Sequence, residues 1–205
     1  MSVQRGPLLA GDFLVRQNDR FEAFYLIQSG VLRSETASYK GRRRVKWFYF
    51  PGDLIGMEAI SSKQWPADIS VIHKTCICEI PADKFTRAAQ HYPQIQQQLF
   101  SRFGERILNQ EYSLSTDFSE AATARLLEYL LQLHKRLQGT GFVSGSQLAL
   151  PMTKSELASY LGMSAETLSR VLNKLEVKGL IDNQLQSIDL LDRTRLAETL
   201  EHAQR

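Results

Sequence analysis

The segment from Met152 to Leu180 constrains the fold more than any other part of the sequence. Thr153 stands three residues before Glu156, which is the spacing of a helix capping box. Apolar residues then recur on one face of a first helix. Gly162 is placed to end that helix because glycine accepts a positive φ, and Ser164 is placed to cap a second helix. The segment therefore predicts a helix-turn-helix, whose second helix enters the major groove of DNA.

The second predicted helix has one apolar and one polar face. Glu166, Ser169 and Arg170 share the polar face near the N-terminal end, the part of such a helix that reaches base edges. Arginine can bond guanine O6 and N7, and glutamate can accept from the cytosine amino group. The alternative interpretation is a solvated helix face with an i, i+4 ion pair. The apolar face consists of Leu168, Val171, Leu172 and Leu175.

Charge alone does not single out this segment. The chain carries 25 basic and 22 acidic residues, a net charge of +3, and residues 118–205 are neutral overall with 10 of each sign. Phosphate contacts dominate DNA affinity, so the segment must rely on a local patch for which Arg170, Lys174 and Lys178 are candidates. The predicted DNA-binding residues are Glu166, Ser169, Arg170, Thr153, Ser164, Thr167 and Lys174.

At these residues the sequence SAETLSRVLNKLEVKGLI resembles the recognition helix of the Crp/Fnr family of bacterial transcription regulators. It is most similar to the Fnr-like branch, which carries an E-x-x-S-R signature. The resemblance implies that Glu166, Ser169 and Arg170 read TTGAT half-sites in an inverted repeat of double-stranded DNA. It also implies a homodimer that works as an activator, with RNA polymerase as a further partner.

Residues 8–80 read as β structure, with short strands predicted and glycines between them. The phrases FYLIQSGVLR and FPGDLIGMEAI resemble the double-stranded β-roll (jelly roll) sensor domain of the same family. We therefore predict an α+β chain with a β-roll over 1–92, a dimerisation helix over 93–117 and a winged helix-turn-helix over 118–205. The predicted strands are Phe13–Val15, Phe24–Ile27, Val31–Leu32, Val45–Phe50, Ile69–Ile72 and Cys76–Ile80.

The roll lacks features of the nucleotide-binding members of the family. Gly52-Asp53-Leu54 and Glu58 match the form of their Gly-Glu element, but no arginine lies between Arg44 and Arg87. The arginine of those members holds the cyclic phosphate, for which a guanidinium fork is suited. We therefore predict no bound cyclic nucleotide. The stretch MEAISSKQWP instead resembles the Fnr-like subgroup.

An iron–sulfur cluster is not expected either. Cys78 matches the roll cysteine of iron–sulfur Fnr proteins, but their N-terminal cysteines have no counterpart here, and two thiolates cannot supply four cluster ligands. Cys76 and Cys78 share one face of a predicted strand with Ile80. We expect two small thiols buried in the core, with a redox switch as the alternative.

Residues 93–117 predict one long helix, with Pro93 in its first turn. A narrow apolar stripe along it is typical of a seam between two helices, and a dimer is what an inverted repeat requires. The alternative is that this stripe packs on the roll. The stripe, which also resembles the dimerisation helix of the family, is Ile95, Leu99, Phe103, Ile107 and Leu114.

The rest of the second half predicts further elements of a winged domain. Asp117 or Ser119 would cap a helix over 120–137, with a core of Leu126, Leu127, Leu130, Leu131 and Leu133. Residues 139–145 read as a loop and 148–151 as a short strand. A hairpin follows Gly179, with Asp182-Asn183 as its turn, and Asp192 caps a last helix over 194–201.

The sequence leaves two other function classes to weigh, an effector-dependent sensor and an enzyme. A sensor whose DNA binding depends on an unknown effector would use space inside the roll, lined by Trp47, Trp65, Met57 and Phe48, although these residues also suit a filled core. An enzyme lacks support because no nucleophile–base constellation or metal-ligand cluster is evident. Without a signal peptide or a long apolar run, a cytoplasmic protein is expected. Arg42, Arg43, Arg44 and Lys46 predict a solvated hairpin tip, or else a contact with RNA polymerase or flanking DNA.

Overall fold

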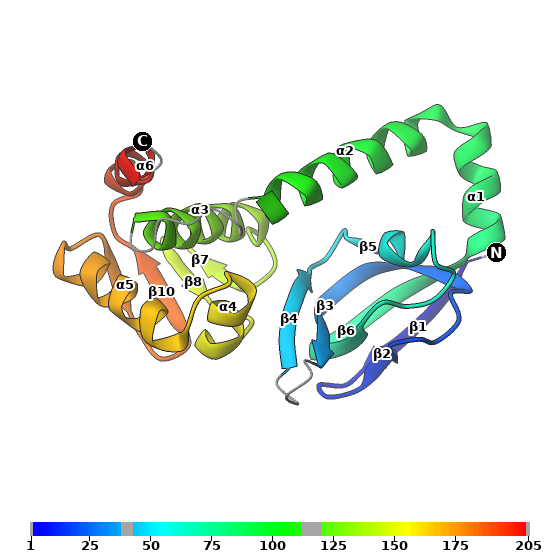
Figure 1. Cartoon of the computed structure of the whole chain (residues 1–205), viewed down its shortest axis with the longest axis horizontal. Helices are drawn as coiled ribbons and strands as arrows, with labels where there is room; N and C mark the ends of the chain where they lie inside the picture. The colour runs from blue at the N-terminus through cyan, green and yellow to red at the C-terminus, as the bar shows by residue number, and fades with distance from the viewer. Residues whose placement is uncertain (1, 38–42, 112–119, 204–205) are drawn as a thin grey trace. The chain divides into compact units, whose positions relative to one another are not determined.

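The computed structural model describes residues 2–37, 43–111 and 120–203. The chain forms two compact units, Met1–Arg106 and Ile107–Arg205. The first holds a β-sheet, helix α1 (Ala82–His91) and most of α2 (Pro93–Glu111), and the second holds a small sheet with four helices (Figure 1). The predicted α+β class is confirmed, with a β-roll before a helix-turn-helix unit.

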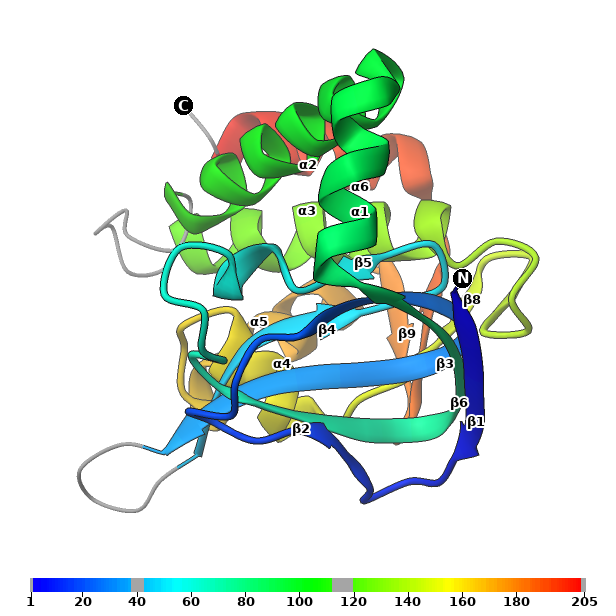
Figure 2. The ribbon, with the colours of Figure 1, turned by 90° about the vertical axis from the view of Figure 1, so that its right-hand side faces the viewer.

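The roll is antiparallel, in the strand order β1-β6-β3-β4, with β2 paired to β6 and β5 paired to β3. Its longest pairing joins β3 to β6 from Ala23 opposite Pro81 to Glu35 opposite Asp68 (Figure 2). The strands are β1 (Val3–Leu8), β2 (Phe13–Val15), β3 (Ala23–Ala37), β4 (Arg43–Tyr49), β5 (Leu54–Ile55) and β6 (Asp68–Pro81).

Two pairs of predicted strands are single long strands. Residues 24–27 and 31–32 both belong to β3, and 69–72 and 76–80 both belong to β6. Gly30 lies in an irregular stretch of β3 rather than in a turn. Its φ is +91°, and a Cβ there would lie 2.2 Å from Thr75 Oγ1. The glycine therefore permits a close approach of β3 to β6. In the sequence it looks like a turn glycine, because the approaching strand is distant along the chain.

Four elements of the described part of the first unit were not predicted: β1, β5, the 3-10 helix η1 (Met57–Ala59) and α1. Helix α1 packs Phe85 against Phe24, with ring centroids 4.2 Å apart. Helix α2 begins at Pro93 as predicted, and it extends to Glu111 in the described residues. The remainder of the predicted 93–117 helix, including Leu114, lies outside the described residues.

Aromatic rings fill the core of the roll. The ring of Trp65, only 1% exposed, lies 5.6 Å from that of Phe21 and 6.0 Å from that of Tyr25 between centroids. The prediction of buried cysteines is wrong, because Cys76 and Cys78 are free and half-buried. Thr75, before them, and Ile77, between them, are the residues of this stretch that point into the interior. The alternation of β6 places the thiols on the opposite face.

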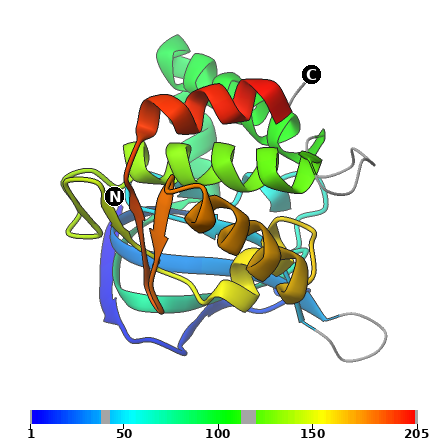
Figure 3. The same ribbon diagram turned by 90° about the vertical axis from the view of Figure 1, so that its left-hand side faces the viewer.

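The second unit combines the sheet β7-β8-β10-β9 with four helices, and α3 runs between α6 and α5 (Figure 3). Of the predicted leucine core of α3, four members are buried and Leu131 is half-buried. The elements are α3 (Glu120–Arg136), β7 (Val143–Ser144), β8 (Gln147–Ala149), α4 (Lys154–Tyr160), α5 (Ala165–Val177), β9 (Ile181–Asn183), β10 (Ser187–Leu190) and α6 (Arg193–Ala203).

The predicted wing hairpin is present, but its turn is displaced. Asp182 and Asn183 belong to strand β9, and the connection to β10 is formed by residues 184–186. Because Ile188 pairs with Asn183, strand β9 continues through the two residues that turn propensity alone had indicated as the turn. Residues 139–145 also contain strand β7, because Val143 pairs with Leu148 of β8. The cap of the last helix is confirmed, since Asp192 Oδ1 accepts from the Arg195 amide at 3.0 Å.

Candidate nucleic-acid interface

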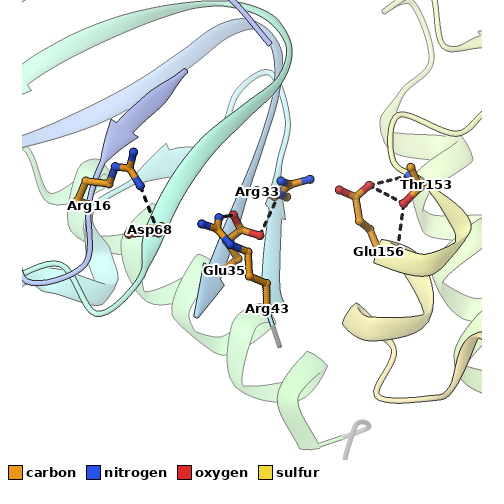
Figure 4. A network of polar contacts seen from close by, with 7 residues as sticks. All are labelled: Arg16, Arg33, Glu35, Arg43, Asp68, Thr153 and Glu156. Atoms are coloured by element: carbon orange, nitrogen blue, oxygen red, sulfur yellow. Dashed lines mark hydrogen bonds and ion pairs between the residues drawn. The ribbon is translucent and has the colours of Figure 1, made fainter. Parts of the chain in front are cut away.

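Both predicted caps of the helix-turn-helix are present. Thr153 Oγ1 accepts from the Glu156 amide at 3.2 Å, and Glu156 Oε2 accepts from the Thr153 amide at 2.7 Å (Figure 4). This reciprocal pair fixes the start of α4. Ser164 Oγ accepts from the Thr167 amide at 3.0 Å and fixes the start of α5. Two of the predicted DNA-contacting hydroxyls are thus engaged in setting helix positions.

Packing determines which face of α5 remains outside. Leu168, Leu172 and Leu175 are almost wholly buried, and Val171 is buried with them. Ala158 of α4 is also buried, and its small side chain suits the close crossing of α4 and α5. Burying four large side chains contributes several kcal/mol at about 1.5–3 kcal/mol each. The helix cannot rotate without exposing this face, so its polar face is fixed outward.

The predicted reading face is exposed. Arg170 Nη2 lies 3.0 Å from Glu166 Oε1, with the two side chains 72% and 79% exposed, and Ser169 is exposed beside them. The ion pair of the alternative interpretation therefore exists. An exposed i, i+4 pair contributes only about 0.3–0.5 kcal/mol, so a bidentate guanine contact of about 1–3 kcal/mol can replace it.

The remaining candidate residues differ in availability. Lys174 on α5 and Lys178 at its C-cap are exposed and suit phosphate contacts, and Thr167 is half-buried. Lys154, which the sequence reasoning did not single out, has its ammonium bound to the wing. Its Nζ donates to Asn183 Oδ1 and to the Gln184 carbonyl, each at 2.7 Å. Burial lowers the pKa of Lys154, and nearby Glu176 acts in the opposite direction.

The wing is thereby joined to both helices of the motif. Glu176 Oε1, near the end of α5, accepts from the Asn183 amide at 3.1 Å. At the turn, Leu185 is 87% exposed. A lysine at the first position of a helix gives no sequence signal for a wing contact, because its partners lie 29 and 30 residues later.

The predicted dimerisation stripe is only partly buried in one chain. Ile95, Leu99 and Phe103 are half-buried, whereas Tyr92 and Phe100 are exposed, Phe100 at 73%. The side chain of Ile107 lies outside the described set, as does Leu114. Phe100 was missed because it falls just beside the stripe of four-residue spacings, although a large aromatic residue on a polar helix face is itself a signal.

The basic cluster after Gly41 is not simply a solvated tip. Arg43 forms an ion pair with Glu35, whose side chain is 4% exposed, and Arg33 Nε lies 3.3 Å from the same carboxylate (Figure 4). Arg44 and Lys46 are exposed on β4, and Arg42 lies outside the described residues. Arg43 is 52% exposed and also contacts a buried acid, because the pairing of β3 with β4 places it beside Glu35, while residues 38–42 of the tip lie outside the described residues.

The region that matches the nucleotide-binding element is occupied by internal contacts. Glu58 accepts hydrogen bonds from the Tyr49 hydroxyl and, at 3.3 Å, from the Gly56 amide. Asp53 Oδ2 accepts from the Phe50 amide at 2.9 Å. Trp65, in the stretch that lacks an arginine, is buried in the aromatic core, and half-buried Trp47 packs against that core. Phe48 and Met57 are also buried.

Within residues 2–37, 43–111 and 120–203, no group of three or more His, Cys, Asp or Glu side chains is arranged to hold a metal ion. None of the helices described there has both the length and the apolar character needed to cross a bilayer.

Known proteins share this arrangement. A family model of the Crp-like helix-turn-helix domain matches residues 124–199, and a model of the cyclic nucleotide-binding domain matches residues 6–92. The chain is 30% identical over 195 residues to the transcriptional activator protein Anr of Pseudomonas protegens. This alignment covers 95% of this chain and 80% of that protein. It is also 30% identical over 195 residues to the anaerobic regulatory protein of Haemophilus influenzae, covering 95% and 76%.

A solved structure supports the same fold. FixK2 from Bradyrhizobium japonicum superposes with a TM-score of 0.78 at 22% identity, over 97% of this chain and 96% of that chain. The matched helix-turn-helix family and the relatives that are transcription regulators define the class of protein, a DNA-binding transcription regulator. The chain belongs to the Crp/Fnr family of transcription regulators.

Proposed function

We propose that this protein is a homodimeric activator that reads an inverted repeat of TTGAT-type half-sites with helix α5. The observation that carries the proposal is the exposed Glu166–Ser169–Arg170 face, held outward by a buried leucine-rich face. Arg170 bonds the guanine of the half-site, and Glu166 accepts from the paired cytosine. Lys174 and Lys178 contact phosphates, and RNA polymerase is the further partner. The relatives named activators support the sign of regulation.

We further propose that DNA binding needs no cyclic nucleotide. The internal bonds of Glu58, the buried ring of Trp65 and the lack of an arginine between Arg44 and Arg87 support this proposal. A cyclic phosphate would find no guanidinium fork in that stretch. Adding cyclic AMP to purified protein should leave its DNA affinity unchanged. A severalfold gain in affinity would favour the effector-dependent alternative.

The direct test is fluorescence anisotropy on a TTGAT-N4-ATCAA duplex, with Arg170→Ala as the test variant. The control duplex has the G·C pair of each half-site changed. We expect tight binding to the parent duplex and weaker binding to the control, because each bidentate contact contributes about 1–3 kcal/mol. In Arg170→Ala the preference for the parent duplex should fall by about 1–3 kcal/mol per half-site, and the preference that remains is the part due to Glu166 and cytosine. Equal, weak binding of wild-type protein to both duplexes would contradict the proposal.

A further inference from the structure

We infer that Asn173 is a further base-reading residue of α5, and that its amide recognises the adenine of an A·T pair next to the G·C pair contacted by Arg170. The inference rests on the proposed function, because it requires α5 to lie in the major groove of a TTGAT-type half-site. It adds a specificity determinant beyond the E-x-x-S-R signature. Asn173 lies three residues after Arg170, within the same helix.

The spacing places Asn173 on the reading face. Glu166, Ser169, Arg170 and Asn173 stand at i, i+3, i+4 and i+7, and positions with these separations share one side of a helix. The homeodomain recognition helix reads bases from four positions with the same separations. Asn173 is exposed, while Leu172 before it is buried. The backbone at Asn173 is held inside the helix, four residues before its end at Val177.

The amide of Asn173 is also uncommitted. Among the described residues, no group donates to or accepts from its side chain. Asn183 provides the contrast, because its Oδ1 accepts from Lys154 and its main-chain amide donates to Glu176. One asparagine of this unit therefore links structural elements, and the other presents one donor group and one acceptor to the outside. Those are the groups that adenine N7 and N6 require.

Helix geometry sets the base pair that the amide can reach. Three residues of helix advance about 4.5 Å, at about 1.5 Å per residue. Successive base pairs are separated by about 3.4 Å. Asn173 therefore faces the pair adjoining the one under Arg170. In TTGAT both neighbours of the G·C pair are A·T pairs, so an adenine is available on either side. A neutral amide at this place reads a base, while adjacent Lys174 supplies charge for phosphate.

The test compares wild type with Asn173→Ala on three duplexes. The first duplex is the parent. The second and the third each change one A·T pair of one half-site to G·C: the second changes the pair on one side of the central G·C pair, and the third changes the pair on its other side. Wild type should prefer the parent by about five- to a hundred-fold at the position that Asn173 reads. In Asn173→Ala that preference should disappear, while the preference at the other neighbour and the Arg170-dependent discrimination remain. Asn173→Asp should instead favour a cytosine in place of the adenine, since a carboxylate accepts from its amino group.

Controls separate a base contact from other roles. Asn173→Ala should fold, because alanine is the better helix former at an exposed position, and circular dichroism melting checks this. Lys178→Ala should weaken all duplexes alike and reduce the salt dependence by about one phosphate contact. If Asn173→Ala also weakened binding to all duplexes alike, the amide would contact phosphate and the inference would be overturned. An Asn173→Ala protein that kept the wild-type preference at both A·T neighbours would overturn it too. Loss of G·C discrimination by the wild type would overturn the proposed function together with this inference.

Discussion

Two arginines of this chain form ion pairs of very different consequence. Arg170 pairs with Glu166 where both side chains are largely in solvent, whereas Arg43 pairs with Glu35, which is buried. Breaking an exposed pair costs about 0.3–0.5 kcal/mol. Removing Arg43 should cost more than this because Glu35 is buried, but less than the about 3–5 kcal/mol of an uncompensated buried charge, since Arg43 is 52% exposed and Glu35 keeps Arg33 at 3.3 Å. Arg170 is therefore available to exchange its partner for a base, whereas Arg43 stabilises the pairing of β3 with β4.

Tyr129 of α3 allows a residue-level prediction about stability. Its ring lies 5.1 Å from that of Tyr160 between centroids, and its hydroxyl is buried without a hydrogen-bond partner among the described residues. An unsatisfied buried hydroxyl costs about 1–3 kcal/mol. Tyr129→Phe should therefore leave the free energy of unfolding at neutral pH unchanged or raise it. Urea unfolding followed by circular dichroism measures this, with exposed Tyr92→Phe as the matched control.

The same substitution should change the alkaline limb of the stability profile. Burial raises the pKa of Tyr129 well above its ordinary value, Tyr160 raises it further, and Arg136 lowers it. The folded state thus holds the phenol proton more tightly than the unfolded state does. The wild type should keep this stability below about pH 10 and lose it as the pH rises from about 10 towards the raised pKa. The stability advantage of Tyr129→Phe should grow over that interval; an advantage that shrinks there would contradict the assignment.

Helices were easier to predict than strands. The caps at Thr153, Ser164 and Asp192 and the turn at Gly162 are properties of a few consecutive residues, and all are found in the structure. The strands depend on partners distant in sequence. Gly30 resembles a turn glycine but permits contact with Thr75, and the wing turn is set by pairing of β9 with β10. Helix α1 was missed although its Phe85 packs on the roll core.

The link between Lys154 and the wing makes an element-level prediction. Lys154→Met keeps the apolar stem but removes both 2.7 Å hydrogen bonds to β9 and the wing turn. We expect faster amide hydrogen exchange at residues 183–187 and weaker binding to all duplexes alike. The salt dependence of binding should stay as in wild type, since this ammonium is already bound within the protein.

A phosphate-contacting lysine supplies the comparison. Lys174→Ala should also weaken binding to every duplex, but it should reduce the salt dependence by about one contact. If Lys154→Met changed the salt dependence as Lys174→Ala does, Lys154 would contact DNA rather than hold the wing. An unchanged exchange rate in the wing would equally count against the link.

At the scale of the whole molecule, an inverted repeat requires two recognition helices about 34 Å apart, one DNA turn. We propose that the apolar side of α2 joins the two subunits, and that exposed Phe100 belongs to this surface beside Leu99 and Phe103. Phe100→Asp should shift the protein from dimer to monomer at micromolar concentration. Because Phe100 is already exposed in one chain, the monomer should stay folded.

Ser101→Asp is the matched control. Ser101 is exposed on the opposite side of α2, so the same charge there should leave the dimer intact. Sedimentation velocity measures the oligomeric state of both variants, and circular dichroism checks their folding. A Phe100→Asp protein that remains dimeric would mean that the subunits meet elsewhere.

The candidate site shows the same division between local and long-range information. Glu166, Ser169 and Arg170 could be placed from sequence because helical periodicity alone brings them to one face. Lys154, Glu176 and Asn183 could not, because their contact requires the folded hairpin. Phe100 could have been noticed as an aromatic residue among glutamines, but its exposure follows only from how the helix packs.

The caps of the helix-turn-helix have an evolutionary consequence. The groups that hold the helix-turn-helix together are Thr153, Ser164 and the buried leucines, and none of them belongs to the outward positions of α5. Substitutions at exposed positions usually change the free energy of unfolding by about 0.5 kcal/mol or less. A lineage can therefore acquire a new operator preference through the outer face of α5 while the domain keeps its stability.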